Sequence, residues 1–259
     1  MNRFEAALRM ADGPAIRSLD FSMFGESDIA NVALQRSEVL HDIRGQADAI
    51  RAWARGDDAP LLRIARQHRQ ALVARAVAFV FLEYRALRGL LQTLRPARIA
   101  DIGCGYGFFD LFAQAEFGAE LVLIDSETAG ARAVKYSETG SGTANLETAR
   151  RFLVANGCAP ARIETLNPTR QNLSQVRDID LAVSLLSCGF AFSCAPYRSF
   201  LRMAVRPGGS VILDLRLRRI REIAQPLTGL GPLRRVGTAA DGKAARMHLV
   251  TAATAARAA

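Results

Sequence analysis

The stretch RIADIGCGYGFFDLF, residues 98–112, decides the fold. Residues 98–102 form a short apolar run that is typical of a buried strand, and a helical pattern begins at Phe108. Glycine stands between them at positions 103, 105 and 107, where the missing Cβ permits a tight turn and lets the main chain approach a ligand. The free N–H groups at the start of the helix favour an anion, either a phosphate or an amino-acid carboxylate. The stretch therefore predicts a ligand-binding strand–loop–helix unit.

Short apolar runs and helical stretches continue to alternate downstream. The helices between the runs are expected to stop at Gly118, Gly157 and Pro207. Asp241-Gly242 predicts the turn of a closing antiparallel hairpin. Residues 96–259 are therefore expected to form an α/β domain with a doubly wound, mostly parallel, seven-stranded sheet and a C-terminal antiparallel hairpin. The five strands predicted before the hairpin are 98–102, 120–125, 162–166, 179–185 and 210–215.

Residues 1–95 carry a helical pattern throughout. Apolar residues recur at spacings of three and four from 31 to 55, which predicts one amphipathic helix. After the break at GDDAP, Asp57 or Asp58 is expected to cap a second helix that runs to Pro96. The chain is therefore predicted to begin with an all-helical region that acts as a lid or a substrate platform.

Two positions distinguish one kind of nucleotide site from another. The dinucleotide fingerprint G-x-G-x-x-G needs its third glycine where this chain has Phe108. An acid also stands two residues before the first glycine. In these features the stretch resembles motif I of the class I S-adenosylmethionine-dependent methyltransferases. Their acid-x-G-x-G-x-G pattern is met by Asp101, Gly103, Gly105 and Gly107.

The resemblance covers about residues 98–250, including RPGGSVILDL, and implies S-adenosylmethionine as cofactor and S-adenosylhomocysteine as product. It places Asp125 where the family binds both ribose hydroxyls, a task that suits the two acceptor oxygens of a carboxylate. The competing interpretation is that Asp125 caps the next helix. The family's acid after the third strand is replaced here by Asn167 or Asn172, so adenine recognition stays open. The residues expected to contact the cofactor are Asp101, Gly103, Cys104, Gly105, Tyr106, Gly107, Asp125, Ser126, Asn167 and Ser187.

The link over residues 126–150 is longer than a minimal connection between a strand and a helix. It contains Gly140-Ser141-Gly142 before a helix that Asn145 is expected to cap. The insertion is predicted to fold over the cofactor or to form a wall of the substrate site.

The acceptor site is expected beyond the carboxyl ends of the strands, at the loop 187–192. This loop is uncharged and lacks the N-P-P-Y or D-P-P-Y signature of adenine methyltransferases, which disfavours methylation of nucleic acid. Asp214 and Tyr197 are the nearest candidates for a general base, and the catalytic residue stays unknown. The three histidines, His41, His68 and His248, are interpreted as packed or surface residues.

A group of four arginines follows the fifth predicted strand. It predicts either a site for an acidic or phosphorylated substrate or a solvated helix face, and the Arg-rich background favours the solvated face. The four are Arg216, Arg218, Arg219 and Arg221.

The chain of 259 residues is 50% hydrophobic and has a formal net charge of +9 from 34 basic and 25 acidic residues. Apart from Lys135 and Lys243 the basic residues are arginines, and they are scattered, which disfavours a nucleic-acid surface. The 4 cysteines lack metal-ligand spacing, so reduced thiols, no metal site and a cytoplasmic location are expected. Neither a secretory signal nor a membrane span is predicted.

These features together predict methyl transfer from S-adenosylmethionine to a small molecule, at oxygen, with a sugar or related metabolite as one acceptor class. Two alternatives stay open. A nicotinamide-dependent oxidoreductase would share the fold but is opposed by Phe108. A non-catalytic methyltransferase-like binding module is permitted by the shortage of obvious bases. The expected partner is the small-molecule acceptor, and the oligomeric state is not predicted.

Overall fold

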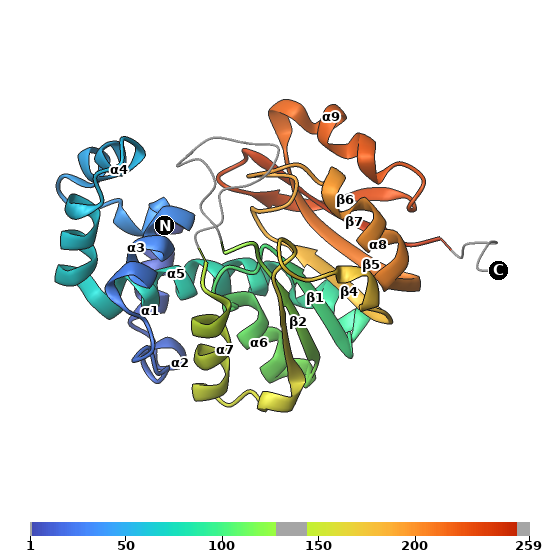
Figure 1. Ribbon diagram of the computed structural model, residues 1–259, viewed down its shortest axis with the longest axis horizontal. Helices are drawn as coiled ribbons and strands as arrows, with labels where there is room; N and C mark the ends of the chain where they lie inside the picture. The colour runs from blue at the N-terminus through green and yellow to red at the C-terminus, as the bar shows by residue number, and fades with distance from the viewer. Residues whose placement is uncertain (1, 128–143, 253–259) are drawn as a thin grey trace.

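A seven-stranded sheet forms the centre of the α/β region in the computed structural model, which describes residues 2–127 and 144–252 (Figure 1). The strand order is β3-β2-β1-β4-β5-β7-β6. The first five strands are parallel, and β7 runs antiparallel to both β5 and β6. This architecture confirms the predicted fold class. The strands are β1 (Arg98–Ile102), β2 (Glu120–Ile124), β3 (Ile163–Leu166), β4 (Ile179–Ser184), β5 (Val205–Arg216), β6 (Leu233–Ala239) and β7 (Ala244–Val250).

Both faces of the sheet are buried, which explains why its central strands are apolar without polar alternation. Leu121 and Leu123 of β2 belong to the apolar cluster that contains α6 and α7, whereas Val122 and Ile124 belong to the cluster that contains α8 and α9. Helices therefore cover the sheet on both sides. They are α6 (Phe108–Phe117), α7 (Leu146–Ala155), α8 (Arg198–Ala204) and α9 (Ile220–Ala224).

The N-terminal region is helical, as predicted, but its first long helix is broken. The prediction of one helix over 31–55 was wrong, because Arg36 has non-helical dihedrals (φ −131, ψ 66) and Gly45 is left-handed (φ 79). A short 3-10 turn at Ser37–Leu40 lies between the two breaks. The predicted second helix is present and is interrupted at Arg69. The helices are α1 (Arg3–Ala11), α2 (Pro14–Arg17), α3 (Glu26–Gln35), α4 (Gln46–Ala54) and α5 (Ala59–Leu94).

The helical region and the sheet share one apolar core. Residues of α1, α3 and α5 join the same cluster as β1, β2 and β4, so the helices are packed onto the sheet. In Figure 1 the long helix α5 lies between the smaller N-terminal helices and the strands. Side chains of residues 1–95 can therefore reach the carboxyl ends of the strands.

The sequence predicted several helix ends correctly and one incorrectly. Asn145 caps α7 by accepting a hydrogen bond from the Thr148 N–H (3.0 Å), and Gly118 ends α6 in a left-handed conformation. Pro207 does not end the helix before β5, because α8 already ends at Ala204 and Pro207 lies within β5. The predicted insertion around Gly140-Ser141-Gly142 lies outside the described residues. Among the helices of residues 2–127 and 144–252, none is both long and apolar enough to cross a membrane.

Candidate functional site

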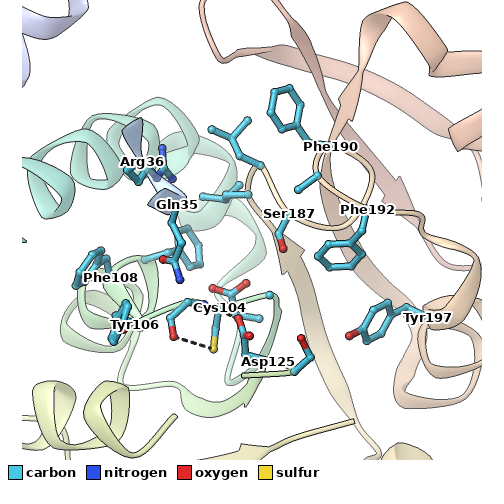
Figure 2. Close-up of a pocket in the computed structure, with 18 of the residues that line it drawn as sticks. Gln35, Arg36, Cys104, Tyr106, Phe108, Asp125, Ser187, Phe190, Phe192 and Tyr197 are labelled. Carbon is cyan, nitrogen blue, oxygen red and sulfur yellow. Dashed lines mark hydrogen bonds between the residues drawn. The ribbon is translucent and has the colours of Figure 1, made fainter. Parts of the chain in front are cut away.

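A large cavity of about 1380 Å³ lies at the carboxyl ends of β1, β2 and β4, where the sequence places the reacting site. Its walls include the glycine loop after β1, the loop after β4 and the N-terminal helices (Figure 2), together with the segment after β3. The turn of the β6–β7 hairpin adds Asp241 and Lys243. The cavity therefore joins segments that are far apart in the sequence.

The three glycines of the loop all have positive φ, but they face different neighbours. A Cβ on Gly103 would lie 1.8 Å from Ser187 Oγ, and a Cβ on Gly105 would lie 2.7 Å from Gln35 Oε1. Both glycines line the cavity, as do Cys104 and Tyr106 of the same loop. A Cβ on Gly107 would instead approach Leu153 Cδ1 at 3.2 Å, so Gly107 lets α6 pack against α7. The loop is a bare main-chain cradle only at Gly103 and Gly105.

Asp125 follows β2 and lies against the glycine loop. Its Oδ2 accepts a hydrogen bond from the Gly105 N–H (3.1 Å) and its Oδ1 accepts one from the Glu127 N–H (3.2 Å). Burial raises the pKa of Asp125 to about 6, although these hydrogen bonds act in the opposite direction. Because Asn145 caps α7, Asp125 is not the cap of that helix. Ser126 lines the cavity beside it.

Asn167 is buried (3% exposed) and does not line the cavity. Its Nδ2 donates to the Ser126 carbonyl (2.9 Å) and to Glu127 Oε2 (2.9 Å), while its Oδ1 accepts from the N–H and hydroxyl of Thr169. The structure thus uses this amide to tie the segment after β3 to the segment after β2. The polar residues that line the cavity from this side include Thr169, Gln171 and Asn172.

The loop after β4 forms an aromatic wall. Ser184 fixes the start of this loop, because its hydroxyl donates to the Ile102 carbonyl (2.5 Å) and accepts from the Cys188 N–H (2.8 Å). Ser187, Phe190 and Phe192 then line the cavity, as Figure 2 shows. Further along, Tyr197 also lines it, with its ring centroid 6.0 Å from that of Phe192.

Tyr197 keeps its proton at neutral pH. Burial raises the pKa of its hydroxyl above the usual value, so the group can donate a hydrogen bond but is a poor general base. Of the two predicted bases, it is the one that faces the cavity.

The prediction of Asp214 as a base was wrong. Asp214 is fully buried, does not line the cavity, and accepts two hydrogen bonds from Arg246 (2.8 and 2.7 Å). The two residues are direct partners in the β5–β7 register, so Arg246 and not the neighbouring Arg216 neutralises the carboxylate. Its Oδ2 also accepts from the Leu186 N–H (3.2 Å), which anchors the loop after β4.

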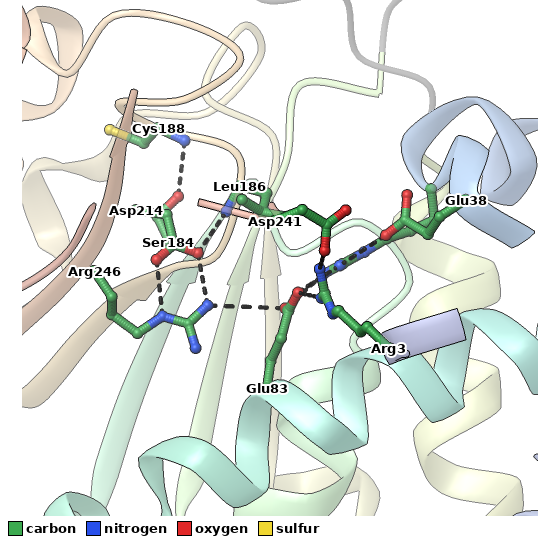
Figure 3. A network of polar contacts seen from close by, with 10 residues as sticks. Arg3, Glu38, Glu83, Ser184, Leu186, Cys188, Asp214, Asp241 and Arg246 are labelled. Carbon is green, nitrogen blue, oxygen red and sulfur yellow. Dashed lines mark hydrogen bonds and ion pairs between the residues drawn. The ribbon is translucent and has the colours of Figure 1, made fainter. Parts of the chain in front are cut away.

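The Asp214–Arg246 pair belongs to a buried charge network that joins the helical region to the sheet (Figure 3). Glu83 of α5 accepts two hydrogen bonds from Arg36 (2.8 and 2.9 Å) and lies 3.9 Å from Arg246. Burial opposes ionisation of Glu83, but the charge of Arg36 holds its pKa below the usual value. Arg3 of α1 also pairs with Glu83. The network fixes the helical wall of the cavity relative to the loop after β4.

Several residues that line the cavity come from the helical region and were not predicted individually. Gln35 extends from the end of α3 toward the glycine loop (Figure 2), and His41 and Trp53 lie further along the same wall. His41 is exposed and packs against Phe4 (5.0 Å between ring centroids), in keeping with its interpretation as a packed or surface residue, and it also borders the cavity. The sequence predicted only that residues 1–95 act as a lid or a substrate platform. It could not predict these individual residues, because they reach the site through tertiary packing and not through a local motif.

The four arginines after β5 have separate environments. The Arg216 guanidinium lies 4.2 Å from the Phe190 ring centroid, and its Nε donates to the Phe190 carbonyl (2.9 Å) at the cavity wall. Arg218, Arg219 and Arg221 do not line the cavity. They fit the interpretation of a solvated face.

Within residues 2–127 and 144–252, no group of three or more His, Cys, Asp or Glu side chains is arranged to hold a metal ion. The 4 cysteines are free thiols, three of them buried. Burial raises the pKa of Cys104 well above its usual value, so this thiol in the glycine loop is not a nucleophile at neutral pH.

The strand order with its antiparallel hairpin gives this chain a Rossmann-like fold, and the glycine loop lies at the cavity. No protein-family model and no curated protein matches the sequence.

Solved structures similar to this chain were found at low sequence identity. One is a predicted O-methyltransferase from Nostoc punctiforme, with 13% identity, a TM-score of 0.47 and coverage of 68% of this chain but only 59% of that one. Another is the ribosomal protein L11 methylase from Lactobacillus delbrueckii subsp. bulgaricus (15% identity, 69% and 79% coverage, TM-score 0.46). A third is the O-methyltransferase TomG from Streptomyces achromogenes, in complex with S-adenosylmethionine (16% identity, 65% and 79% coverage, TM-score 0.42).

Proposed function

We propose that this protein is an S-adenosylmethionine-dependent methyltransferase that acts on a small molecule, with oxygen as the acceptor atom. The observation that supports it most is the contact between the Asp125 carboxylate and the Gly105 N–H at the cavity wall. It places an acid suited to a ribose diol directly beside a main-chain cradle that has no room for a Cβ.

The residues of the cavity fit the parts of this cofactor. The bare main chain at Gly103 and Gly105 would receive its amino-acid portion, and Asp125 would accept hydrogen bonds from its ribose hydroxyls. Thr169, Gln171 and Asn172 offer polar groups on the side expected for the adenine. When bound, the cofactor supplies an electrophilic methyl group on a sulfonium.

The cavity has room for an acceptor as well. Its volume of about 1380 Å³ exceeds the roughly 300–1,000 Å³ of an ordinary small-molecule pocket, so a cofactor and a small acceptor can be held together. The wall of Phe190, Phe192 and Trp53 suits an apolar or ring-shaped acceptor, and the same rings would exclude water during transfer.

The chemistry requires positioning more than acid–base catalysis. In-line methyl transfer needs the acceptor atom held about 3–3.5 Å from the methyl carbon. Tyr197 can orient an acceptor oxygen as a hydrogen-bond donor, and His41 and Glu38 are titratable groups of the helical wall that could receive the acceptor proton. Asp214 has no part in proton transfer, because its carboxylate oxygens already accept hydrogen bonds from the Arg246 guanidinium and the Leu186 N–H.

Calorimetric titration with S-adenosylhomocysteine tests the proposal. Wild type should bind, and Asp125→Ala should lose at least about tenfold in affinity, since a bidentate charged contact contributes about 1.5–3 kcal/mol. Glu222→Ala, an exposed change outside the cavity, serves as the matched control and should bind like wild type. No binding by wild type, or equal binding by wild type and Asp125→Ala, would reject the site.

The nicotinamide alternative finds less support. Phe108 occupies the position of the third fingerprint glycine and is buried among aromatic rings, 5.4 Å from Phe152 and 6.1 Å from Phe24 between centroids. A fluorescence titration with NADH under the same conditions should show no saturable binding.

A further inference from the structure

Beneath the glycine loop lies a pair of buried carboxyls without a counterion. Asp101 at the end of β1 is 4% exposed and lines the cavity, and Asp110 in the first turn of α6 is fully buried. Three of their four oxygens, Asp101 Oδ1 and both oxygens of Asp110, have no hydrogen-bond partner among the described residues. Buried carboxylate oxygens are rarely left unsatisfied, so this pair requires a physical explanation.

The charged and titratable groups around the pair do not neutralise it. Neither acid takes part in an ion pair of the described residues, and Arg36, the cation whose charge lowers the pKa of Asp101, is already bound to Glu83. The charge of Asp125 acts on Asp101 as well and also raises its pKa. The thiols of Cys104 and Cys158 lie close enough to sense these acids and are held protonated.

Two such carboxyls cannot both be ionised at low cost. Burial raises the pKa of Asp110 to about 7, and burial together with the neighbouring Asp110 raises that of Asp101 well above its usual value. The two groups are close enough to share a hydrogen bond, which forms only when one of them is protonated. Below neutral pH the pair without ligand therefore holds more protons than two free aspartates would hold.

We propose that Asp101 and Asp110 form a proton-releasing site for a primary ammonium group, and that Asp110 sets its proton content. When the α-ammonium of the cofactor enters the cavity at Asp101, the positive charge replaces a carboxyl proton, which passes to solvent. In this step the ammonium N–H donates a hydrogen bond to a carboxylate oxygen, the carboxyl O–H bond breaks, and water takes up the proton. No atom changes its oxidation state. Asp110 acts through Asp101 and is a positioning residue. This inference rests on the proposed function, because it takes its ligand from it.

The test is proton release measured by titration calorimetry in two buffers of different ionisation enthalpy at pH 6. The two probes are S-adenosylhomocysteine and its analogue that lacks only the α-amino group. Any proton lost by Asp125 on ribose binding is common to both probes. For wild type, S-adenosylhomocysteine should release about one proton more than the analogue.

Two variants identify the source of that proton. In Asp110→Asn the side-chain amide has no proton to lose and can donate a hydrogen bond to the Asp101 carboxylate, so the difference between the probes should fall clearly below the wild-type value. Asp125→Asn is the matched control: both probes should bind less tightly, but the difference should persist. Equal release by both probes in wild type overturns the inference, and so does an unchanged difference in Asp110→Asn. Should that variant not fold, the wild-type comparison decides. No binding of either probe rejects the proposed function, and this inference with it.

Discussion

At the scale of single residues, the role of each glycine in the loop depends on the atoms that a Cβ at its position would contact. The sequence predicted all three glycines of the loop as one motif, but a Cβ at Gly103 meets Ser187 and one at Gly107 meets Leu153. Asp125 could be predicted because it ends an apolar strand. Asp214 could not, because its partner Arg246 lies 32 positions away on a strand whose register is set by tertiary pairing.

Gly103→Ala should abolish cofactor binding and destabilise the fold. The new methyl would lie 1.8 Å from Ser187 Oγ. The overpacking costs about 1–3 kcal/mol, in addition to roughly 1–2 kcal/mol for a left-handed alanine. Gly118→Ala is the control, since φ is +62 there and nothing lies within 4 Å of a Cβ. Denaturant unfolding should show that Gly118→Ala loses only the roughly 1–2 kcal/mol of the left-handed alanine. Equal losses of unfolding free energy in the two variants would contradict the close contact between a Cβ at Gly103 and Ser187.

The pKa of Asp125 near 6 predicts the pH dependence of nucleoside binding. Because the ionised carboxylate accepts the ribose hydrogen bonds, affinity for adenosine should be constant well above pH 6 and should fall as pH drops below it. The dissociation constant measured between pH 5 and pH 8 checks this. A dissociation constant that does not change with pH in wild type would contradict this prediction, and so would the same pH dependence in Asp125→Asn.

The buried acid pair also predicts how stability varies with pH. The pKa of Asp110 is about 7 in the folded chain, above the roughly 3.9 of an unfolded aspartate. Its contribution to stability is therefore complete below about pH 4 and is lost as pH rises through about 7. Asp110→Asn should be more stable than wild type at pH 8, by about 1–3 kcal/mol, with the advantage shrinking toward pH 4. Thermal unfolding at both pH values measures it, and a variant less stable at pH 8 would contradict it.

At the scale of elements, periodicity predicted β1 to β4 to within one residue, but it placed the start of β5 five residues late and missed the break in the helix over 31–55. The apolar spacing continues through Arg36, yet this residue leaves helical geometry and its guanidinium binds Glu83 of α5. A contact between residues 47 positions apart leaves no local signal. The break matters for the site, because it places Gln35 and His41 on the cavity wall.

Glu83→Gln should destabilise the protein strongly. Glu83 is 5% exposed and receives Arg3 and Arg36, so its neutralisation leaves buried guanidinium charge without compensation and should cost about 3–5 kcal/mol. Arg66→Ala, which breaks the exposed ion pair with Glu26, should cost at most about 1 kcal/mol. Urea unfolding compares the two, and similar small losses would show that the network does not hold the helices to the sheet.

At the scale of the whole molecule, the helical region and the sheet share a core and together enclose the cavity. The sequence could predict the fold class, the glycine loop and the position of the site, since each depends on local pattern. It could not predict which helical residues face the cofactor or the acceptor, because that depends on how two distant halves pack. Under the proposed function, this shared wall, and not the motif, would select the acceptor.

A crystal structure with S-adenosylhomocysteine tests the central claim most directly. The account predicts the ligand in the crevice between the glycine loop and the aromatic wall, with both ribose hydroxyls within hydrogen-bond distance of the Asp125 carboxylate and the α-amino group near Asp101. A crevice that stays empty at saturating ligand, or a ligand bound away from Asp125, would contradict it.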